Sequence, residues 1–225
     1  LPIPKRMRWG ASREEFVRPA HWIVAMLGRD SNHGEVLGLR TGNVTRGHRF
    51  HAPGDIVLQD PMEYEQVLAQ AKVIACFEHR RESIREQVEV EASALQASAV
   101  IDPDLLEEVT GLVEWPVALT GAFEERFLQV PAEALISSMK EHQKYFHLVD
   151  GQGALRPNFI TIANIESEDP VQVIAGNERV IRPRLSDAAF FFDTDRKTPL
   201  AQRVTALEGV VFQQKLGSLA DKTRR

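Results

Sequence analysis

Residues 114–146, EWPVALTGAFEERFLQVPAEALISSMKEHQKYF, decide the fold that the chain is expected to adopt. They predict an apolar strand over Trp115–Leu119, a turn at Thr120–Gly121, and a helix opened by Pro131, because proline loses no hydrogen bond at the first helical position. Apolar residues then recur at steps of three and four, so the helix has one apolar face. We expect this strand and this face to form the seam of the core.

The segments before this stretch predict two short strands followed by helices. Two apolar runs of strand length, Pro19–Leu27 and Glu35–Leu39, are separated by a turn and predict a hairpin. Asp60-Pro61 places a capping carboxylate before a proline, which is typical of a helix start. A longer helix is expected over about 77–97, and another short one begins at Asp102-Pro103.

The segments after the stretch predict a hairpin and then helices alone. Tyr145–Val149 and Asn158–Ala163 are strand candidates joined by a glycine-rich turn. Beyond Asp169-Pro170 we expect helix, with breaks near Arg182-Pro183 and Thr198-Pro199, and no strand. The fold class is therefore α+β, with mixed or antiparallel sheets and helices over residues 1–167 and a helical segment over residues 168–225.

The composition is that of an ordinary globular protein and excludes several classes. The 225 residues are 43% hydrophobic and 26% charged, and no apolar run approaches the ~20 residues that span a bilayer. The single cysteine, Cys76, cannot form an internal disulfide, which fits a reducing compartment, so we expect a cytoplasmic protein without membrane contact. The net charge of −5 comes from an acidic middle between two mildly basic ends, so charge alone does not argue for nucleic acid.

Motifs for self-contained chemistry are absent from the sequence. It contains no P-loop, no G-x-G-x-x-G and no H-E-x-x-H, and its seven histidines follow no zinc pattern. We therefore expect no catalytic residue, no metal site and no cofactor in this chain. Ser138 and His142, four apart on the predicted helix, are interpreted as polar surface positions because no nucleophile elbow accompanies them.

Two basic clusters are candidate binding sites, each with an alternative. In RGHRFH, residues 46–51, Arg46, Arg49 and the imidazoles could bind phosphate while Phe50 stacks on a base. Alternatively this segment is a strand whose side chains pair with acidic residues.

The second cluster, NERVIRPR at residues 177–184, holds Arg182 and Arg184 beside a proline. These arginines could bind a phosphate or a carboxylate, or they could pair internally with Asp187, Asp193 or Asp195. Lys140 and Lys144, on the charged face of the predicted central helix, complete the set of candidate RNA or subunit contacts.

Seven blocks in this chain resemble the β subunit of bacterial-type tetrameric glycyl-tRNA synthetase. They occur in the family's order from end to end. The blocks are LPIPKRMRWG (1–10), RGHRFH (46–51), LVEWPVALTG (112–121), FLQVPAEALISSMKEHQKYF (127–146), PNFITIANIES (157–167), GNERVIRPRLSDAAFFFDTD (176–195) and FQQKLGSLADKTRR (212–225). Because the family's chains are much longer, we expect this sequence to be an internal portion of one.

The resemblance implies a part of a class II α2β2 ligase that joins glycine to glycine tRNA. In that family the α subunit carries the adenylation chemistry, using ATP with Mg²⁺, and the β subunit supplies tRNA recognition. The resemblance also implies a module similar to B3/B4 of phenylalanyl-tRNA synthetase, followed by helices that lead into an HD-like domain. Three roles remain open for this chain: tRNA recognition and bridging to the α subunit, hydrolytic editing, or a structural scaffold.

Overall fold

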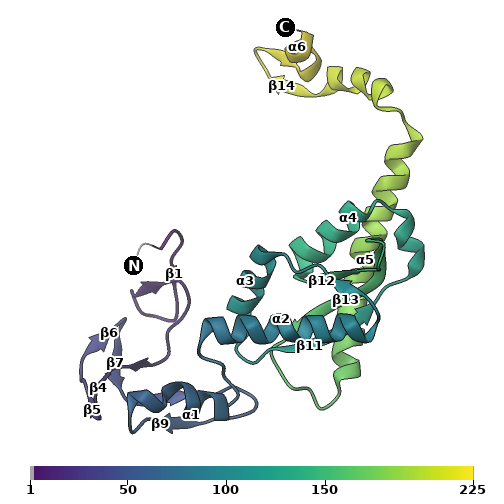
Figure 1. Cartoon of the computed structure of the whole chain (residues 1–225). Helices are drawn as coiled ribbons and strands as arrows, with labels where there is room; N and C mark the ends of the chain where they lie inside the picture. Colours follow the sequence, from purple (N-terminus) through teal and green to yellow (C-terminus); the bar gives the residue numbers. More distant parts are fainter. Residues whose placement is uncertain (1–2, 225) are drawn as a thin grey trace. The chain divides into compact units, whose positions relative to one another are not determined.

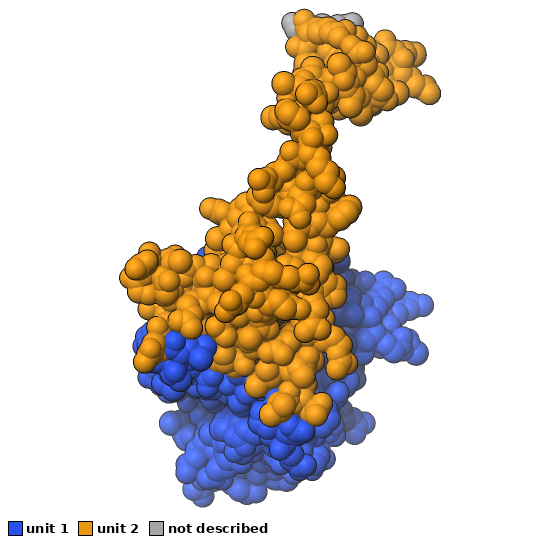
Figure 2. All heavy atoms as spheres, turned by 90° about the vertical axis from the view of Figure 1, so that its right-hand side faces the viewer, with its two compact units in different colours: residues 1–95, 101–119, 162–170 blue, residues 96–100, 120–161, 171–225 orange. Residues whose placement is uncertain are grey.

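The chain folds into two compact units in a computed structural model that describes residues 3–224. Unit 1 comprises residues 1–95, 101–119 and 162–170, and unit 2 comprises residues 96–100, 120–161 and 171–225 (Figure 2). Helices and several small sheets occur in the chain, which confirms the α+β class (Figure 1). The division at residues 167 and 168 and the likeness to a B3/B4 module stay predictions.

Unit 1 begins with short strands in small sheets. The strands are β1 (Met7–Arg8), β2 (Glu15–Phe16), β3 (Ile23–Val24), β4 (Met26–Leu27), β5 (Asp30–Ser31), β6 (Glu35–Val36), β7 (Leu39–Gly42), β8 (Val44–Arg46) and β9 (Asp55–Val57). The predicted pairing of 19–27 with 35–39 is wrong. Instead β4 pairs with β5, and β7 pairs antiparallel with β6 and parallel with β3. Gly28, with φ of +57°, allows a tight turn between β4 and β5, so residues expected in a longer loop form strand β5 instead.

The helices of unit 1 follow the predicted starts. They are the 3-10 helix η1 (Pro61–Glu63), α1 (Tyr64–Gln70), α2 (Phe77–Ala94) and α3 (Pro103–Leu112). The Asp60 and Asp102 carboxylates accept backbone N–H bonds at 2.9 and 3.0 Å, which confirms both caps. Helix α2 packs against α3 and buries Ile84, Val88 and Ala92 along one stripe.

The largest sheet has the strand order β10-β12-β13-β11. Its strands are β10 (Ser98–Ala99), β12 (Phe146–Val149), β13 (Leu155–Ala163) and β11 (Val117–Ala122). The predicted hairpin over 145–163 is confirmed, with Phe146 opposite Ile160. The predicted turn at Thr120–Gly121 is wrong, because both residues continue β11. A Cβ at Gly121 would lie 2.4 Å from Cζ of Phe159. Glycine at this position therefore leaves space for the Phe159 ring and does not mark a turn.

The helix opened at Pro131 changes character part-way. After η2 (Glu125–Gln129), α4 runs over Ala132–Ser137 and continues as the π-helix η3 (Ser138–Gln143), which ends at Lys144 in a left-handed conformation with φ of +60°. Leu135 and Met139 are fully buried, as the spacing predicts. They join Tyr145 and Phe159 in one apolar cluster within unit 2, together with Ile181 and Leu185.

Helix α5 (Pro170–Lys197) supplies those last two residues and is continuous. The predicted break at Arg182-Pro183 is therefore wrong, since Pro183 lies inside the helix although it lacks an N–H donor. The break near Pro199 is confirmed, because the 3-10 helix η4 (Leu200–Gly209) begins after it.

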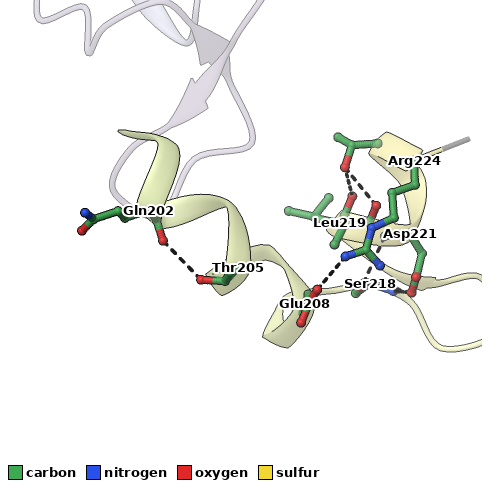
Figure 3. Close-up of polar contacts among 9 residues, drawn as sticks. Gln202, Thr205, Glu208, Ser218, Leu219, Asp221 and Arg224 are labelled. Carbon is green, nitrogen blue, oxygen red and sulfur yellow. Dashed lines mark hydrogen bonds and ion pairs between the residues drawn. The ribbon is translucent and has the colours of Figure 1, made fainter. Parts of the chain in front are cut away.

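The C-terminal residues form a small hairpin that the sequence did not indicate. Strands β14 (Val211–Gln213) and β15 (Gly217–Ser218) pair before α6 (Leu219–Arg224), so the prediction of helix alone is wrong. Asp221 and Ser218 cap α6 reciprocally: the Asp221 carboxylate accepts the Ser218 N–H at 2.9 Å, and the Ser218 hydroxyl oxygen accepts the Asp221 N–H at 3.2 Å (Figure 3). Arg224 pairs with Glu208 at 2.6 Å and ties α6 to the end of η4.

Candidate nucleic-acid interface

The segment RGHRFH, residues 46–51, leaves β8 as a tight turn that we name the arginine turn. Strand β8 pairs with β9 in register, with Arg46 opposite Asp55. At Gly47 a Cβ would lie 2.5 Å from Cβ of Ala71 and 2.8 Å from its carbonyl oxygen, so only glycine fits. The next residue, His48, donates its backbone N–H to the same carbonyl at 2.9 Å. The close approach fixes where the turn begins.

His48 organises the arginine turn from inside. Its side chain is 1% exposed. Nδ1 accepts the backbone N–H groups of Phe50 and His51, both at 3.3 Å, so the ring proton lies on Nε2. Nε2 then donates to the carbonyl oxygen of Asn164 at 2.7 Å. The prediction that this imidazole binds phosphate is wrong, because both ring nitrogens are used within unit 1.

A second set of polar contacts holds the other end of the arginine turn. Nε2 of His51 accepts the backbone N–H of Glu166 at 3.0 Å. The Glu166 carboxylate accepts bonds from the Trp115 indole N–H at 2.9 Å and from the Lys72 ammonium at 3.0 Å. These two donors lower the pKa of Glu166 below its usual 4.5. The Asn164 side chain adds two bonds, accepting the N–H groups of residues 114 and 115.

The arginine turn presents two side chains to solvent. Phe50 is 70% exposed, although it is a large aromatic residue. Arg49 is exposed, and within residues 3–224 it has no hydrogen-bond or ion-pair partner. The alternative prediction, pairing with acidic residues, holds only for Arg46, whose Nε lies 2.9 Å from the Asp55 carboxylate. A fixed backbone therefore carries a cation and an exposed ring side by side in the sequence.

A hollow of about 570 Å³ adjoins the arginine turn within unit 1. Leu68 and Val73 contribute apolar lining. The polar and aromatic residues that line it are His21, Trp22, Thr45, Arg46, Arg49, Tyr64 and Glu114. The Arg46 guanidinium carbon lies 5.5 Å from the centre of the Trp22 ring. We call this the aromatic hollow.

The other four predicted contacts lie in unit 2. Arg182 pairs with Glu124 at 2.9 Å, so its predicted pairing with Asp187, Asp193 or Asp195 is wrong. The acid that meets it comes from the chain before η2 and not from α5 itself. Arg184, two positions along α5, is exposed and has no such partner within residues 3–224.

Lys140 and Lys144 lie at the π-helix and are half-buried. Both already interact with other groups of the chain. Ser138 donates its hydroxyl to the Ala134 carbonyl at 3.0 Å, which agrees with its interpretation as an ordinary helical residue. The π-helix therefore offers less unpaired positive charge than the sequence suggested.

Among the residues that line the aromatic hollow, sequence reasoning did not identify Trp22, Tyr64 and Glu114 as candidate contacts. They come from a loop before β3, from the start of α1 and from the segment after α3. No local spacing connects residues so far apart in the chain. The only available signal was the unusual density of arginine and aromatic residues in the arginine turn beside them.

Comparison with known proteins identifies the family. The family model described as "Glycyl-tRNA synthetase beta subunit" matches residues 1–225. The chain belongs to the glycyl-tRNA synthetase beta subunit family. It is similar to proteins named glycine–tRNA ligase beta subunit, with 65% identity over 225 residues in Chromohalobacter salexigens and 60% over 227 residues in Marinobacter nauticus. Each alignment covers 100% of this chain and 33% of the relative, so the chain spans about a third of their length.

The resemblance noted in the sequence is thereby confirmed at the level of the family. Within residues 3–224, no helix combines the length and the apolar character that a membrane crossing requires.

Proposed function

We propose that this chain is the part of a glycine–tRNA ligase β subunit that contacts glycine tRNA and links it to the α subunit. Adenylation of glycine with ATP and Mg²⁺ takes place on the α subunit in this proposal. The family membership and the lack of a nucleotide-binding motif support this division of labour. The observation that carries the tRNA contact is the arginine turn, in which buried His48 holds Arg49 and Phe50 at the surface.

The physical argument is one of charge and of preorganisation. An exposed guanidinium without an internal partner binds phosphate without first breaking a contact. An exposed phenyl ring stacks on an unpaired base, which is a common mode of RNA recognition. Because His48 accepts two backbone N–H groups of the turn, little conformational freedom is lost on binding.

Arg184 is the next proposed contact, for the same reason. Arg46 and Arg182 follow, since each must exchange an exposed acidic partner for a phosphate, and exposed pairs contribute only about 0–1 kcal/mol. Lys140 and Lys144 come last, because both already interact within the chain.

The test is Arg49→Ala in the assembled ligase, with glycine tRNA binding measured across a series of salt concentrations. Loss of one phosphate contact should weaken binding and reduce the slope of log K against log salt by about 1. Arg85→Ala is the matched control, because Arg85 on α2 is already paired with Glu82 and Glu89. It should leave both the affinity and the slope unchanged.

Two other outcomes would favour the alternatives. If Arg49→Ala and Phe50→Ala leave tRNA affinity and slope intact, the arginine turn does not meet RNA. A chain that then still co-purifies with the α subunit is a scaffold. Release of the amino acid from mischarged tRNA by the ligase, lost on substitution in this chain, would instead indicate an editing module.

A further inference from the structure

The aromatic hollow combines features that the proposed tRNA contact does not use. Trp22 and Tyr64 line it and remain 42% and 38% exposed, so ring surface from both is open to a ligand. Its volume of about 570 Å³ lies within the range of about 300–1,000 Å³ that is typical of small-molecule sites. Two aromatic rings in a hollow of this size suit a flat, aromatic ligand.

Arginine at the same hollow adds a phosphate-binding element. Arg49 has no partner within the described residues, and Arg46 is held only by its exposed pair with Asp55 and by the Trp22 ring. A guanidinium donates two parallel N–H bonds to a phosphate. The ligand class that carries both an aromatic ring and a phosphate is a nucleotide.

Glu114 narrows the choice of base. Its backbone is fixed at both sides, because its N–H donates to Asn164 Oδ1 at 2.8 Å and its carbonyl accepts from the Ile74 N–H at 2.8 Å. Within residues 3–224 its carboxylate has neither a hydrogen bond nor an ion pair. The Glu114 carboxylate therefore lines the hollow with two oxygens that can accept hydrogen bonds, and the backbone of the residue is fixed.

We propose that the aromatic hollow binds one unpaired guanosine nucleotide of an RNA, with Glu114 accepting from N1–H and the 2-amino group. This inference rests on the proposed function, because the tRNA supplies the nucleotide. The ring lies against Trp22 and Tyr64, and the phosphate lies at Arg46 and Arg49.

The hydrogen-bonding edges of the four bases explain the preference. Guanine presents two adjacent donors on its Watson–Crick edge, and these match the two oxygens of a carboxylate. Adenine and cytosine each present one donor beside an acceptor, and uracil presents a single donor between two acceptors. An acceptor of the base facing a carboxylate oxygen is repelled, so the other three bases bind more weakly.

Calorimetric titration of the 225-residue chain with GMP, IMP and AMP tests the proposal. We expect GMP to bind at least about fivefold more tightly than AMP, since one bidentate pair discriminates by that amount or more. IMP lacks the 2-amino group and should fall between them.

Glu114→Gln is the decisive variant, because an amide presents one donor and one acceptor. It should lower the GMP-to-AMP affinity ratio to 1 or below, since a glutamine pairs with adenine. Among the residues that the structure describes, no hydrogen bond or ion pair of the Glu114 carboxylate is lost in this variant, so an unchanged thermal midpoint is expected. Glu86→Gln on α2 is the control and should leave the ratio unchanged, because Glu86 lies outside the hollow.

Equal affinity for GMP and AMP, or no binding of either, would overturn the guanosine site. Failure of the guanosine site can be distinguished from failure of the proposed tRNA contact. If Arg49→Ala still weakens tRNA binding while GMP is not preferred, only the base assignment falls. If GMP is preferred but Arg49→Ala leaves tRNA affinity unchanged, the ligand is a free nucleotide and the assignment to RNA is wrong.

Discussion

The arginine turn and the apolar cluster of unit 2 are held by different kinds of interaction. Around the turn, side chains bond to backbone groups far away in the chain, as when His48 donates to the carbonyl of Asn164. In the apolar cluster, Tyr145 stacks on Phe159 with ring centres 4.4 Å apart, and Leu135 and Ile181 are fully buried beside them. The first region is specified by hydrogen-bond geometry and the second by shape and apolar area.

The apolar cluster therefore mainly stabilises the fold, whereas the contacts of the arginine turn mainly hold Arg49 and Phe50 at the surface. A buried aromatic side chain contributes several kcal/mol but tolerates other apolar residues of similar volume. A buried imidazole with every nitrogen used contributes less, yet few other side chains reproduce its contacts. In the region that holds Arg49 and Phe50, the hydrogen-bonding groups of a side chain therefore restrict the choice of residue more than its volume does.

Truncation of the apolar cluster should have the largest effect. Phe159→Ala removes a fully buried ring and leaves a cavity, so we expect a loss of about 3–5 kcal/mol in the free energy of unfolding. Urea unfolding followed by far-UV circular dichroism measures the change. Tryptophan fluorescence reports separately on the unfolding of unit 1, because Trp9, Trp22 and Trp115 all lie in that unit.

Gly121 supplies the control for this first prediction. Gly121→Ala alone should destabilise by about 1–3 kcal/mol, because the new Cβ would overlap the Phe159 ring. In a Phe159→Leu background the overlapping ring atom is gone, so the same change should cost less. Additive effects of the two substitutions would contradict the close packing of Gly121 and Phe159.

Substitution of His48 should have the next largest effect. His48→Ala leaves two backbone N–H groups and one carbonyl without their partner at a part-buried site, which predicts a loss of about 2–4 kcal/mol. Glycine tRNA binding should fall as well, because the arginine turn is no longer held. Unfolding and tRNA binding are measured on the same preparation.

Two replacements dissect the role of this imidazole. His48→Asn keeps an acceptor near the position of Nδ1, and His48→Gln keeps a donor that reaches toward Asn164. We expect asparagine to preserve tRNA binding better, because Nδ1 is the atom that holds the turn. Equal binding by the alanine and asparagine variants would show that the turn is not organised by His48.

The same contrast explains which features could be predicted from the sequence. Spacing predicted the burial of Leu135 and Met139, and aspartate before proline predicted the helix starts, because these signals act within one turn of helix. The continuity of α5 through Pro183 was missed, since packing of Ile181 and Leu185 outweighs one absent hydrogen bond. Propensity is a weaker influence than tertiary contact here.

The candidate site was predicted only in part, for a related reason. The density of Arg46, Arg49 and Phe50 pointed to the correct turn, but the role of His48 depends on Asn164, which lies 116 residues away. The aromatic hollow needs residues from three further segments. Such pairings carry no period and no motif, so they emerge only with the fold.

Glu166 should show a smaller effect that depends on pH. Its pKa is lowered in the folded chain by the Trp115 and Lys72 donors, so the ionised form is the one that stabilises. The contribution is complete above the ordinary value of 4.5 and disappears as the pH falls through the lower folded value. Glu166→Gln should therefore be less stable than the parent at pH 7 and equal to it in acid. Urea midpoints from pH 7 to about pH 3 measure the convergence, with Glu86→Gln as the control.

Loss of the ion pair of Arg182 with Glu124 should have the smallest effect on stability. It tests whether the Arg182 guanidinium is available to bind RNA. The two side chains are 56% and 39% exposed, so Arg182→Ala should cost no more than about 1 kcal/mol of unfolding free energy. Arg182→Lys, which keeps the charge but loses the planar guanidinium, is the matched variant. A weak pair leaves the guanidinium available to RNA, and the alanine variant should then lower tRNA affinity more than it lowers stability. A loss of more than about 2 kcal/mol would place Arg182 with the structural contacts of the apolar cluster, since an exposed pair does not supply so much.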